Sequence, residues 1–225
     1  MAITTMKRYE LKFVLNKSQF DYLKEALKPY MEIDEYGNSR IISIYYDTKD
    51  YRLIRTSVEK PKFKEKIRLR KYNDDDYFLE IKRKLDKIVY KRRIKTTKEK
   101  VDEFFKYQGD LGDEQIAREL KEFRNTYGTL IPAFLVIYDR IAYFKKDDDI
   151  RLTIDYNLKY RGENVNFDNI DDSDYIVDED TSILEIKVQG SIPLWLTNIL
   201  KEGNIYKSSF SKVGTAYKKY LTNRM

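Results

Sequence analysis

Basic side chains recur at every second position along three segments of the chain, and this spacing is the first indication of chemistry. The segments are FKEKIRLRKY (63–72), YFLEIKRK (77–84) and KIVYKRRIKT (87–96). Successive side chains of a β-strand point to opposite faces, so residues two apart share one face. Arginine forks and lysine point charges hold phosphate oxygens well. A face of this kind therefore suits a chain of phosphates.

The same sorting, applied to all eight predicted strands, gives one face with 13 basic and 3 acidic residues. The whole chain has 44 Lys and Arg and 38 Asp and Glu, which leaves 31 basic and 35 acidic residues elsewhere. An ordinary solvated face is the alternative for any single strand, but such a face carries both signs in similar amounts. The face consists of Arg8, Glu10, Lys12, Lys66, Arg68, Arg70, Glu80, Lys82, Lys84, Lys91, Arg93, Lys95, Arg140, Arg151, Glu185 and Lys187.

Histidine and cysteine are both absent from the sequence. Their absence excludes Cys/His zinc sites, thiol nucleophiles and catalytic triads that use imidazole. Any metal must bind carboxylate oxygens, as Mg²⁺ and Mn²⁺ do. The glutamates of the charged face could hold such an ion on bound phosphates. We therefore expect Mn²⁺ or Mg²⁺ as the cofactor.

Eight strands and five helices are predicted to position these residues. Period-two alternation predicts strands at 8–15, 41–48, 63–72, 77–84, 87–96, 133–144, 151–156 and 182–189. Apolar residues at helical spacing and capping residues predict helices at 17–28, 96–107, 113–127, 193–202 and 210–221. The acidic stretch 168–180 is predicted to be a loop.

Eight strands are enough to close a barrel. The predicted fold class is α+β: an antiparallel, eight-stranded closed β-barrel with a basic lumen and flanking helices. No linker or internal repeat is visible, so a single domain over residues 1–225 is expected. No segment is long and apolar enough to span a membrane or to act as a signal peptide, which makes the cytoplasm the expected location.

Eight strings, spread in order from residue 8 to residue 212, carry a family resemblance. They resemble the triphosphate tunnel metalloenzyme (CYTH-like) superfamily and, within it, the VTC (vacuolar transporter chaperone) polyphosphate polymerase domain. Each string alone is weak, but the ordered set is strong. The strings are Arg8-Tyr9-Glu10-Leu11-Lys12-Phe13, Tyr45-Tyr46-Asp47-Thr48-x-x-Tyr51, Lys66-Ile67-Arg68-Leu69-Arg70-x-Tyr72, Leu79-Glu80-Ile81-Lys82, Tyr138-Asp139-Arg140-Ile141-Ala142-Tyr143, Arg151-Leu152-Thr153-Ile154-Asp155, Ile183-Leu184-Glu185-Ile186-Lys187 and Phe210-Ser211-Lys212.

The resemblance implies a tunnel in which basic residues grip a triphosphate or polyphosphate. It assigns catalytic roles to Arg70, Lys82 and Arg140, and metal binding to Glu185, helped by Glu80 or Glu10. Lys91 and Arg93 stand on the following basic strand, whose register the sequence leaves open by one residue. The implied phosphate ligands are Lys12, Arg68, Arg70, Lys82, Lys91, Arg93, Arg140, Arg151, Lys187 and Lys212.

One position departs from the hydrolytic branches of the superfamily. Those branches begin with E-x-E-x-K, whereas Arg8 replaces the first carboxylate here, so that only Glu10 and Lys12 remain. This departure favours the VTC branch over a triphosphatase or an adenylyl cyclase. The eukaryotic VTC proteins add a sensing domain and membrane helices, which this chain has no room for, so a stand-alone soluble catalytic domain is expected.

The resulting expectation is an ATP-dependent polyphosphate polymerase, a phosphotransferase that moves the γ-phosphate of ATP onto a growing polyphosphate chain. The first alternative is a hydrolase of inorganic triphosphate or nucleoside triphosphates in the same tunnel. The second is a module that binds polyphosphate, or a nucleic acid, without catalysis. The 20 Tyr and 11 Phe among basic residues would suit base stacking, but most are explained by core packing. ATP and inorganic polyphosphate or triphosphate are the expected partners, and no nucleic acid is expected.

Overall fold

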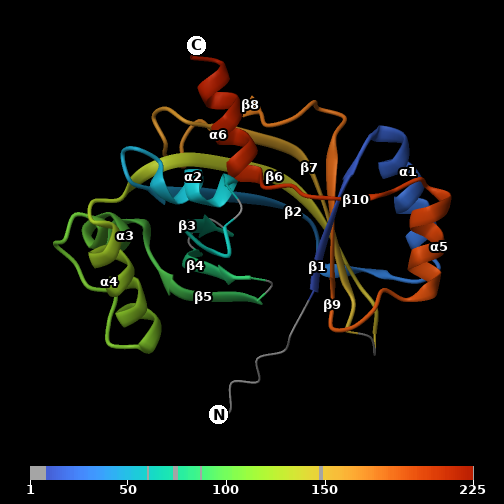
Figure 1. The fold of residues 1–225 in the computed structure, drawn as a ribbon, viewed down its shortest axis with the longest axis horizontal. Coiled ribbons are helices and arrows are strands. Elements are labelled where there is room, and N and C mark those ends of the chain that lie inside the picture. Colours follow the sequence, from blue (N-terminus) through green and yellow to red (C-terminus); the bar gives the residue numbers. More distant parts are fainter. Residues whose placement is uncertain (1–8, 60, 73–75, 87, 147–148, 225) are drawn as a thin grey trace. The chain divides into compact units, whose positions relative to one another are not determined.

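The computed structural model of the chain describes residues 9–59, 61–72, 76–86, 88–146 and 149–224 (Figure 1). Within these residues, hydrogen bonds order the strands as β10-β1-β9-β7-β6-β2-β3-β4-β5, with β8 beside β7. The strands are β1 (Tyr9–Leu15), β2 (Glu32–Asp47), β3 (Phe63–Lys71), β4 (Tyr77–Leu85), β5 (Ile88–Thr96), β6 (Ile131–Phe144), β7 (Arg151–Arg161), β8 (Asp174–Tyr175), β9 (Ser182–Val188) and β10 (Lys207–Ser208).

All eight predicted strands form, and two short strands, β8 and β10, are added among the described residues. A two-residue strand has no measurable period, which is why neither was predicted. Strand β2 begins at Glu32, well before the predicted start at 41, because its first half is largely exposed on both faces and so lacks alternation. The strand order is a linear path, so hydrogen bonds between described residues do not close the predicted barrel.

The five predicted helices form as well, together with one helix, α2, that was not predicted. Helix α2 has seven residues, too few to show a helical period. Helix α3 begins after Thr97 and not Thr96, because Thr96 is the last residue of β5 and the Thr97 hydroxyl accepts from Lys100 N at 3.3 Å. The helices are α1 (Lys17–Leu27), α2 (Arg52–Val58), α3 (Lys98–Phe105), α4 (Gln115–Tyr127), α5 (Leu194–Glu202) and α6 (Lys212–Thr222). None of them, within the described ranges, has the length and apolar character of a membrane-spanning helix.

The chain divides into two compact units. Unit 1 comprises residues 1–40, 138–158 and 177–211, and unit 2 comprises residues 41–137, 159–176 and 212–225. Strands β2, β6 and β7 contribute residues to both units. A single domain over residues 1–225 stays a prediction.

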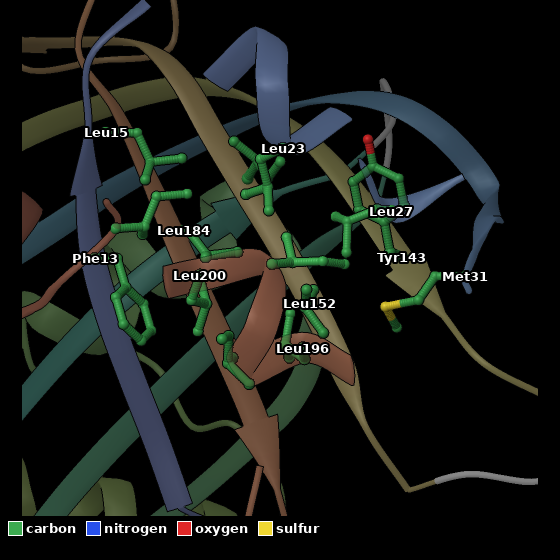
Figure 2. Close-up of a cluster of buried hydrophobic side chains, with 14 of the residues drawn as sticks. Phe13, Leu15, Leu23, Leu27, Met31, Tyr143, Leu152, Leu184, Leu196 and Leu200 are labelled. Atoms are coloured by element: carbon green, nitrogen blue, oxygen red, sulfur yellow. The ribbon is translucent and has the colours of Figure 1, made fainter. Parts of the chain in front are cut away.

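Unit 1 has its own apolar core, which lies between helices α1 and α5 and one face of the sheet (Figure 2). Helix α1 is fixed at its start by a capping box, in which Asn16 Oδ1 accepts from Gln19 N and Gln19 Oε1 accepts from Asn16 N. The two helices cover the apolar side chains of the strands, and the polar side chains of the strands lie on the opposite face. Figure 2 shows Phe13, Leu15, Leu152 and Leu184 from the strands together with Leu23, Leu27, Leu196 and Leu200 from the helices.

Unit 2 has a second core, built in the same way. Ile67 and Leu69 of β3 and Leu79 of β4 are almost fully buried against helices α3 and α4. These helices contribute Phe104 and Leu120, and α2 adds Leu53. Burial of each such side chain contributes about 1.5–3 kcal/mol. In both units the charged face is thus the face that the core does not use.

Asp47, at the end of β2, has a structural role. Its Oδ1 accepts from Leu53 N at 2.9 Å, and its Oδ2 accepts from Ile54 N at 2.8 Å. These bonds satisfy free amides in the first turn of α2, whose N-cap residue, Tyr51, is in the left-handed region (φ 58°). Burial raises the pKa of the Asp47 carboxyl in spite of these bonds. Part of the string Tyr45-Tyr46-Asp47-Thr48-x-x-Tyr51 therefore serves to begin helix α2.

Candidate anion-binding site

The register of β2, β3, β4 and β5 places the charged face of unit 2 in three rows. Residues between them along the strands, such as Ile67 and Leu79, enter the core. The predicted apolar positions Ile67, Leu69, Leu79 and Ile81 are buried, but the charged residues Glu65, Arg83 and Arg92 lie on the same side of these strands. The first row is Lys66, Lys82 and Lys91; the second is Tyr45, Arg68, Glu80 and Arg93; the third is Ser43, Arg70, Phe78 and Lys95.

The first row consists of three lysines that face one another across β3, β4 and β5. Lys66 is directly opposite Lys82, and Lys82 is directly opposite Lys91. Facing side chains on neighbouring strands have Cβ atoms about 4.5–5.5 Å apart, and like charges at that distance are destabilising. A polyanion bound along the row would relieve this repulsion. The pairing also settles the register of β5, since Lys91 and Arg93 both lie on the charged face.

Glu80 is the one acidic residue of the second row, and two cations surround it. Arg68 Nε and Nη2 lie 2.8 and 2.7 Å from Glu80 Oε2, and Lys91 Nζ lies 2.7 Å from Oε1. Burial alone would raise the pKa of the Glu80 carboxyl, but Arg68, Arg70 and Lys91 lower it to about 2. Burial lowers the pKa of the Lys91 ammonium to about 8, against the opposing effect of Glu80. Glu80 therefore neutralises part of the cation excess of unit 2.

Tyr45 begins the second row and is buried beside Arg68. Its hydroxyl oxygen accepts from Arg68 Nη1 at 3.0 Å. Burial raises the pKa of the Tyr45 phenol, but Arg68, Lys66 and Arg70 outweigh that effect and lower the pKa to about 7. These three cations thus favour the ionised form of the phenol.

Arg70 and Arg93 meet at one aromatic hydroxyl. Arg70 Nη1 and Arg93 Nη1 donate to Tyr72 Oη at 3.4 and 3.3 Å, and Arg70 Nε donates to Ser43 Oγ at 3.4 Å. The Arg93 guanidinium also lies 4.6 Å from the centroid of the Phe78 ring. Tyr72, Ser43 and the Phe78 ring, which are all neutral, therefore help to orient these two guanidinium groups.

In unit 1 the register of β1, β9 and β7 places opposite charges across from one another. Lys12 faces Glu185, and Lys187 faces Glu10. Facing pairs of opposite charge stabilise a sheet. Two facing pairs of unit 1 therefore combine opposite charges, unlike the lysine row of unit 2, while Lys187 also faces Arg151. The two rows are Lys12, Glu185 and Thr153, and Glu10, Lys187 and Arg151.

Lys12 lies between two carboxylates. Its Nζ is 3.4 Å from Glu10 Oε1 and 3.5 Å from Glu185 Oε2, and it donates to the Phe210 carbonyl at 3.3 Å. Lys187 Nζ contacts the other oxygen of Glu185 at 2.8 Å. Burial lowers the pKa of the Lys12 ammonium, but Glu185 and Glu10 outweigh it and the pKa is raised. Lys12 therefore stays charged at neutral pH.

Arg140 of β6 forms a bidentate pair with a fully buried carboxylate. Its Nε and Nη2 donate to Asp155 Oδ1 and Oδ2 at 2.6 and 2.9 Å, and its guanidinium lies 5.2 Å from the centroid of the Tyr138 ring. Burial lowers the pKa of the guanidinium, whereas Tyr138, Asp155 and Glu185 raise it well above its ordinary value. One edge of the guanidinium is thus engaged, and the group is fixed in one orientation.

The predicted site residues fall into two sets. Lys212 is the first residue of α6. Arg8, on which the choice between branches rests, lies outside the described residues. Unit 1 contains Glu10, Lys12, Arg140, Arg151, Glu185 and Lys187, and unit 2 contains Arg68, Arg70, Glu80, Lys82, Lys91, Arg93 and Lys212.

The three predicted metal ligands are divided between the units. Glu10 and Glu185 fit a hard divalent cation, since both are carboxylates and both lie within 3.5 Å of one lysine nitrogen. Glu80 belongs to unit 2, where Arg68 and Lys91 occupy both of its oxygens. Across the described part of the chain, no group of three acidic side chains is gathered for a metal.

Several neighbours of the site were missed from the sequence. Tyr45 was noted as part of a string but given no role, and Phe78 was not noted at all. The period-two pattern could have found both, because Tyr45 and Phe78 fall on the parity of the charged face. The pairing of Asp155 with Arg140 joins two strands, and no pattern within one strand indicates it.

Comparisons with known proteins give a family and a set of similar folds. The family model of the VTC domain matches residues 7–221. A candidate adenylate cyclase from Bacillus halodurans has a similar structure, with a TM-score of 0.58 at 14% identity over 92% of this chain and 96% of that chain. A protein from Pyrococcus horikoshii gives 0.52 at 17% identity over 94% and 99% of the two chains. A candidate adenylate cyclase from Vibrio parahaemolyticus gives 0.51 at 12% identity over 95% and 98%.

No curated protein matches the chain. At these identities the structural similarity concerns the fold, and it supports the α+β fold with an antiparallel sheet that the sequence predicts.

Proposed function

The chain belongs to the VTC domain family, and from this premise we propose that it is an ATP-dependent polyphosphate polymerase. Family membership supports an enzyme that acts on triphosphate or polyphosphate. The specific reaction, polymerisation of phosphate, is our proposal. The observation that carries it is the lysine row Lys66, Lys82 and Lys91, which lies beside Arg68 and Arg70 on one face. A row of like charges along three strands suits an extended polyanion more than a single small anion.

The reaction needs positioning and charge neutralisation more than covalent catalysis. The terminal phosphate oxygen of the growing chain attacks the γ-phosphorus of ATP in line. The new P–O bond forms as the bond from the γ-phosphorus to the β,γ-bridging oxygen breaks, and ADP leaves with that electron pair. The attacking oxygen is already ionised at neutral pH, so no general base is required. A chain without histidine or cysteine can carry out this transfer.

Each proposed catalytic residue has a place in this step. Lys82 and Arg70 of unit 2 bind phosphate oxygens and neutralise charge that develops on them. Arg140 of unit 1, fixed by Asp155, does the same from its own face. Phosphate binding by Lys12, Arg151, Lys187 and Lys212 is proposed on their family positions.

A divalent cation fits Glu185 and Glu10, and Mn²⁺ or Mg²⁺ bound there would supply further neutralisation of phosphate charge. Lys12 and Lys187 now occupy these carboxylates. The two lysines thus hold the carboxylates in place, and with a cation bound at Glu10 and Glu185 these lysines would be available to phosphate. Glu80 is paired within unit 2, so its contribution is to position Arg68 and Lys91.

The test is product analysis after incubation of the purified protein with ATP and Mn²⁺. A ladder of phosphate chains that is lost in Glu185→Ala supports the polymerase and the metal role together. The matched control is Glu25→Ala, an exposed glutamate on α1. Orthophosphate without a ladder would show a hydrolase. The absence of both products would overturn the proposal that the protein is an enzyme.

A further inference from the structure

An aromatic pair interrupts the charged face of unit 2. Tyr72 follows β3 directly, and Phe78 lies near the start of β4. Their rings meet edge to face, with centroids 5.4 Å apart and an interplanar angle of 85°. On the charged face of β4, Phe78 shares its parity with Glu80, Lys82 and Lys84, which makes it the one apolar side chain of that series.

Two arginines stand against this pair. The Arg93 guanidinium lies 4.6 Å from the centroid of the Phe78 ring, and the Arg70 guanidinium lies 5.6 Å from that of Tyr72. Both donate to the Tyr72 hydroxyl. Tyr72 is 36% exposed and Arg93 is exposed as well, so solvent reaches the outer side of the cluster.

We propose that Tyr72, Phe78 and Arg93 form the docking site for the nucleobase of a nucleoside triphosphate. This inference rests on the proposed function and names the part of the substrate that the phosphate-binding rows do not recognise. Bases stack on aromatic rings and on guanidinium planes, and such stacking tolerates different bases because every base has a π-face. The Arg93–Phe78 stack offers a guanidinium plane, and Tyr72 offers a ring.

The spacing of the rows supports this placement. Two residues along a strand cover about 7 Å, so the row of Arg70 and Phe78 lies about one nucleoside length from the row of Arg68 and Glu80. A nucleotide with its base at Phe78 would direct its phosphates along the strands toward Arg68 and then toward the lysine row. The purely structural alternative is that the rings only hold Arg70 and Arg93 in position for phosphate.

Binding measurements with two ligands separate these readings. ATP carries a base, whereas tripolyphosphate offers phosphates alone. The affinities of both are to be measured by calorimetry for the wild type and for Phe78→Leu, which keeps an apolar side chain but removes the ring. Tyr72→Leu is the second variant. Tyr90→Leu is the matched control, because Tyr90 is an exposed tyrosine of β5 on the opposite face.

For a base site, Phe78→Leu and Tyr72→Leu each weaken ATP binding about tenfold and leave tripolyphosphate binding within twofold, while Tyr90→Leu changes neither. A parallel loss of both ligands would show that the rings only position the arginines and would overturn the inference. Unchanged binding of both ligands would overturn it too, and would leave the polymerase proposal intact. If the wild type bound neither ligand, both proposals would fall.

Discussion

The charged faces of the two units solve the same electrostatic problem in different ways. In unit 1, Lys12 faces Glu185 and Glu10 faces Lys187, so opposite charges meet between β1 and β9. In unit 2, three lysines face one another, and Glu80 is the one carboxylate among the three rows. Carboxylates that face lysines can bind a metal ion in place of those lysines, whereas a row of facing lysines attracts an anion. From this difference we propose cation binding in unit 1 and most of the phosphate binding in unit 2.

The largest effect is expected from removing a guanidinium from either face. Arg70→Ala and Arg140→Ala should each lower kcat/KM for ATP by about 10³-fold, because one arginine on a transferring phosphoryl group contributes that much. Steady-state kinetics of chain synthesis measures it, with circular dichroism to confirm folding. Activity within a few-fold of wild type in either variant contradicts the role assigned to that arginine. A loss in Arg70→Ala alone would place the chemistry in unit 2.

Glu80→Gln tests how strongly unit 2 depends on its one carboxylate. Glu80 is 2% exposed, and its loss leaves Arg68 and Lys91 without their partner. The free energy of unfolding should fall by about 3 kcal/mol at pH 7, as measured by urea denaturation.

The stability that Glu80 contributes should depend on pH. The folded-state pKa of Glu80 is lowered from 4.5 to about 2. Its contribution to stability is therefore complete above about pH 4.5, and it is lost as the pH falls toward 2. The Gln variant should lack this part of the acid transition. An unchanged transition in the variant would show that the Glu80 pairs contribute nothing.

Tyr45 should make phosphate binding weaken as the pH rises. Its phenol has a pKa of about 7 in the free protein, and bound phosphate would raise that pKa because it disfavours a nearby phenolate. Binding therefore takes up a proton above pH 7, and each such proton weakens affinity about tenfold per pH unit. Tyr45→Phe should therefore flatten the fall in tripolyphosphate affinity between pH 7 and 8. Above about pH 8 a second fall is expected in both proteins, because the Lys91 ammonium loses its proton there. Equal slopes for variant and wild type would contradict the assignment.

The smallest effect concerns the exchange of lysine for metal in unit 1. Lys12→Gln removes the ammonium that lies between Glu10 and Glu185. In the absence of phosphate, Mn²⁺ should then bind about fivefold more tightly, because the competing charge is gone. Calorimetry with Mn²⁺ measures this, and Lys17→Gln, an exposed lysine of α1, is the control. No tightening, or the same tightening in Lys17→Gln, would argue against a cation at these two glutamates.

Much of this arrangement could be predicted from the sequence, because it depends on alternation along single strands. The parity that sends Ile67 and Leu69 inward also sends Lys66 and Arg68 to the charged face. What alternation cannot supply is the pairing between strands. The lysine row depends on the register between strands, and so do the different partners that Glu80, Glu10 and Glu185 face.

Other features were missed for a different reason. Asp47 reaches amides six and seven residues later, and this contact depends on where α2 packs. Helix α2 itself is too short to carry a period. Phe78 interrupts a charged series. From the sequence such an aromatic residue is most simply explained by core packing, and its contact with Arg93 is visible only in the structure.

The most direct test of the account is calorimetric titration of the protein with tripolyphosphate, in the wild type, Lys82→Gln and Lys218→Gln. The two substitutions change the charge equally, but Lys82 lies in the middle of the lysine row and Lys218 is exposed on α6. The account predicts that Lys82→Gln weakens binding about tenfold, that Lys218→Gln leaves it unchanged, and that neither lowers the stability of the free protein. Equal affinities for the two variants would contradict the claim that this row holds the phosphate chain.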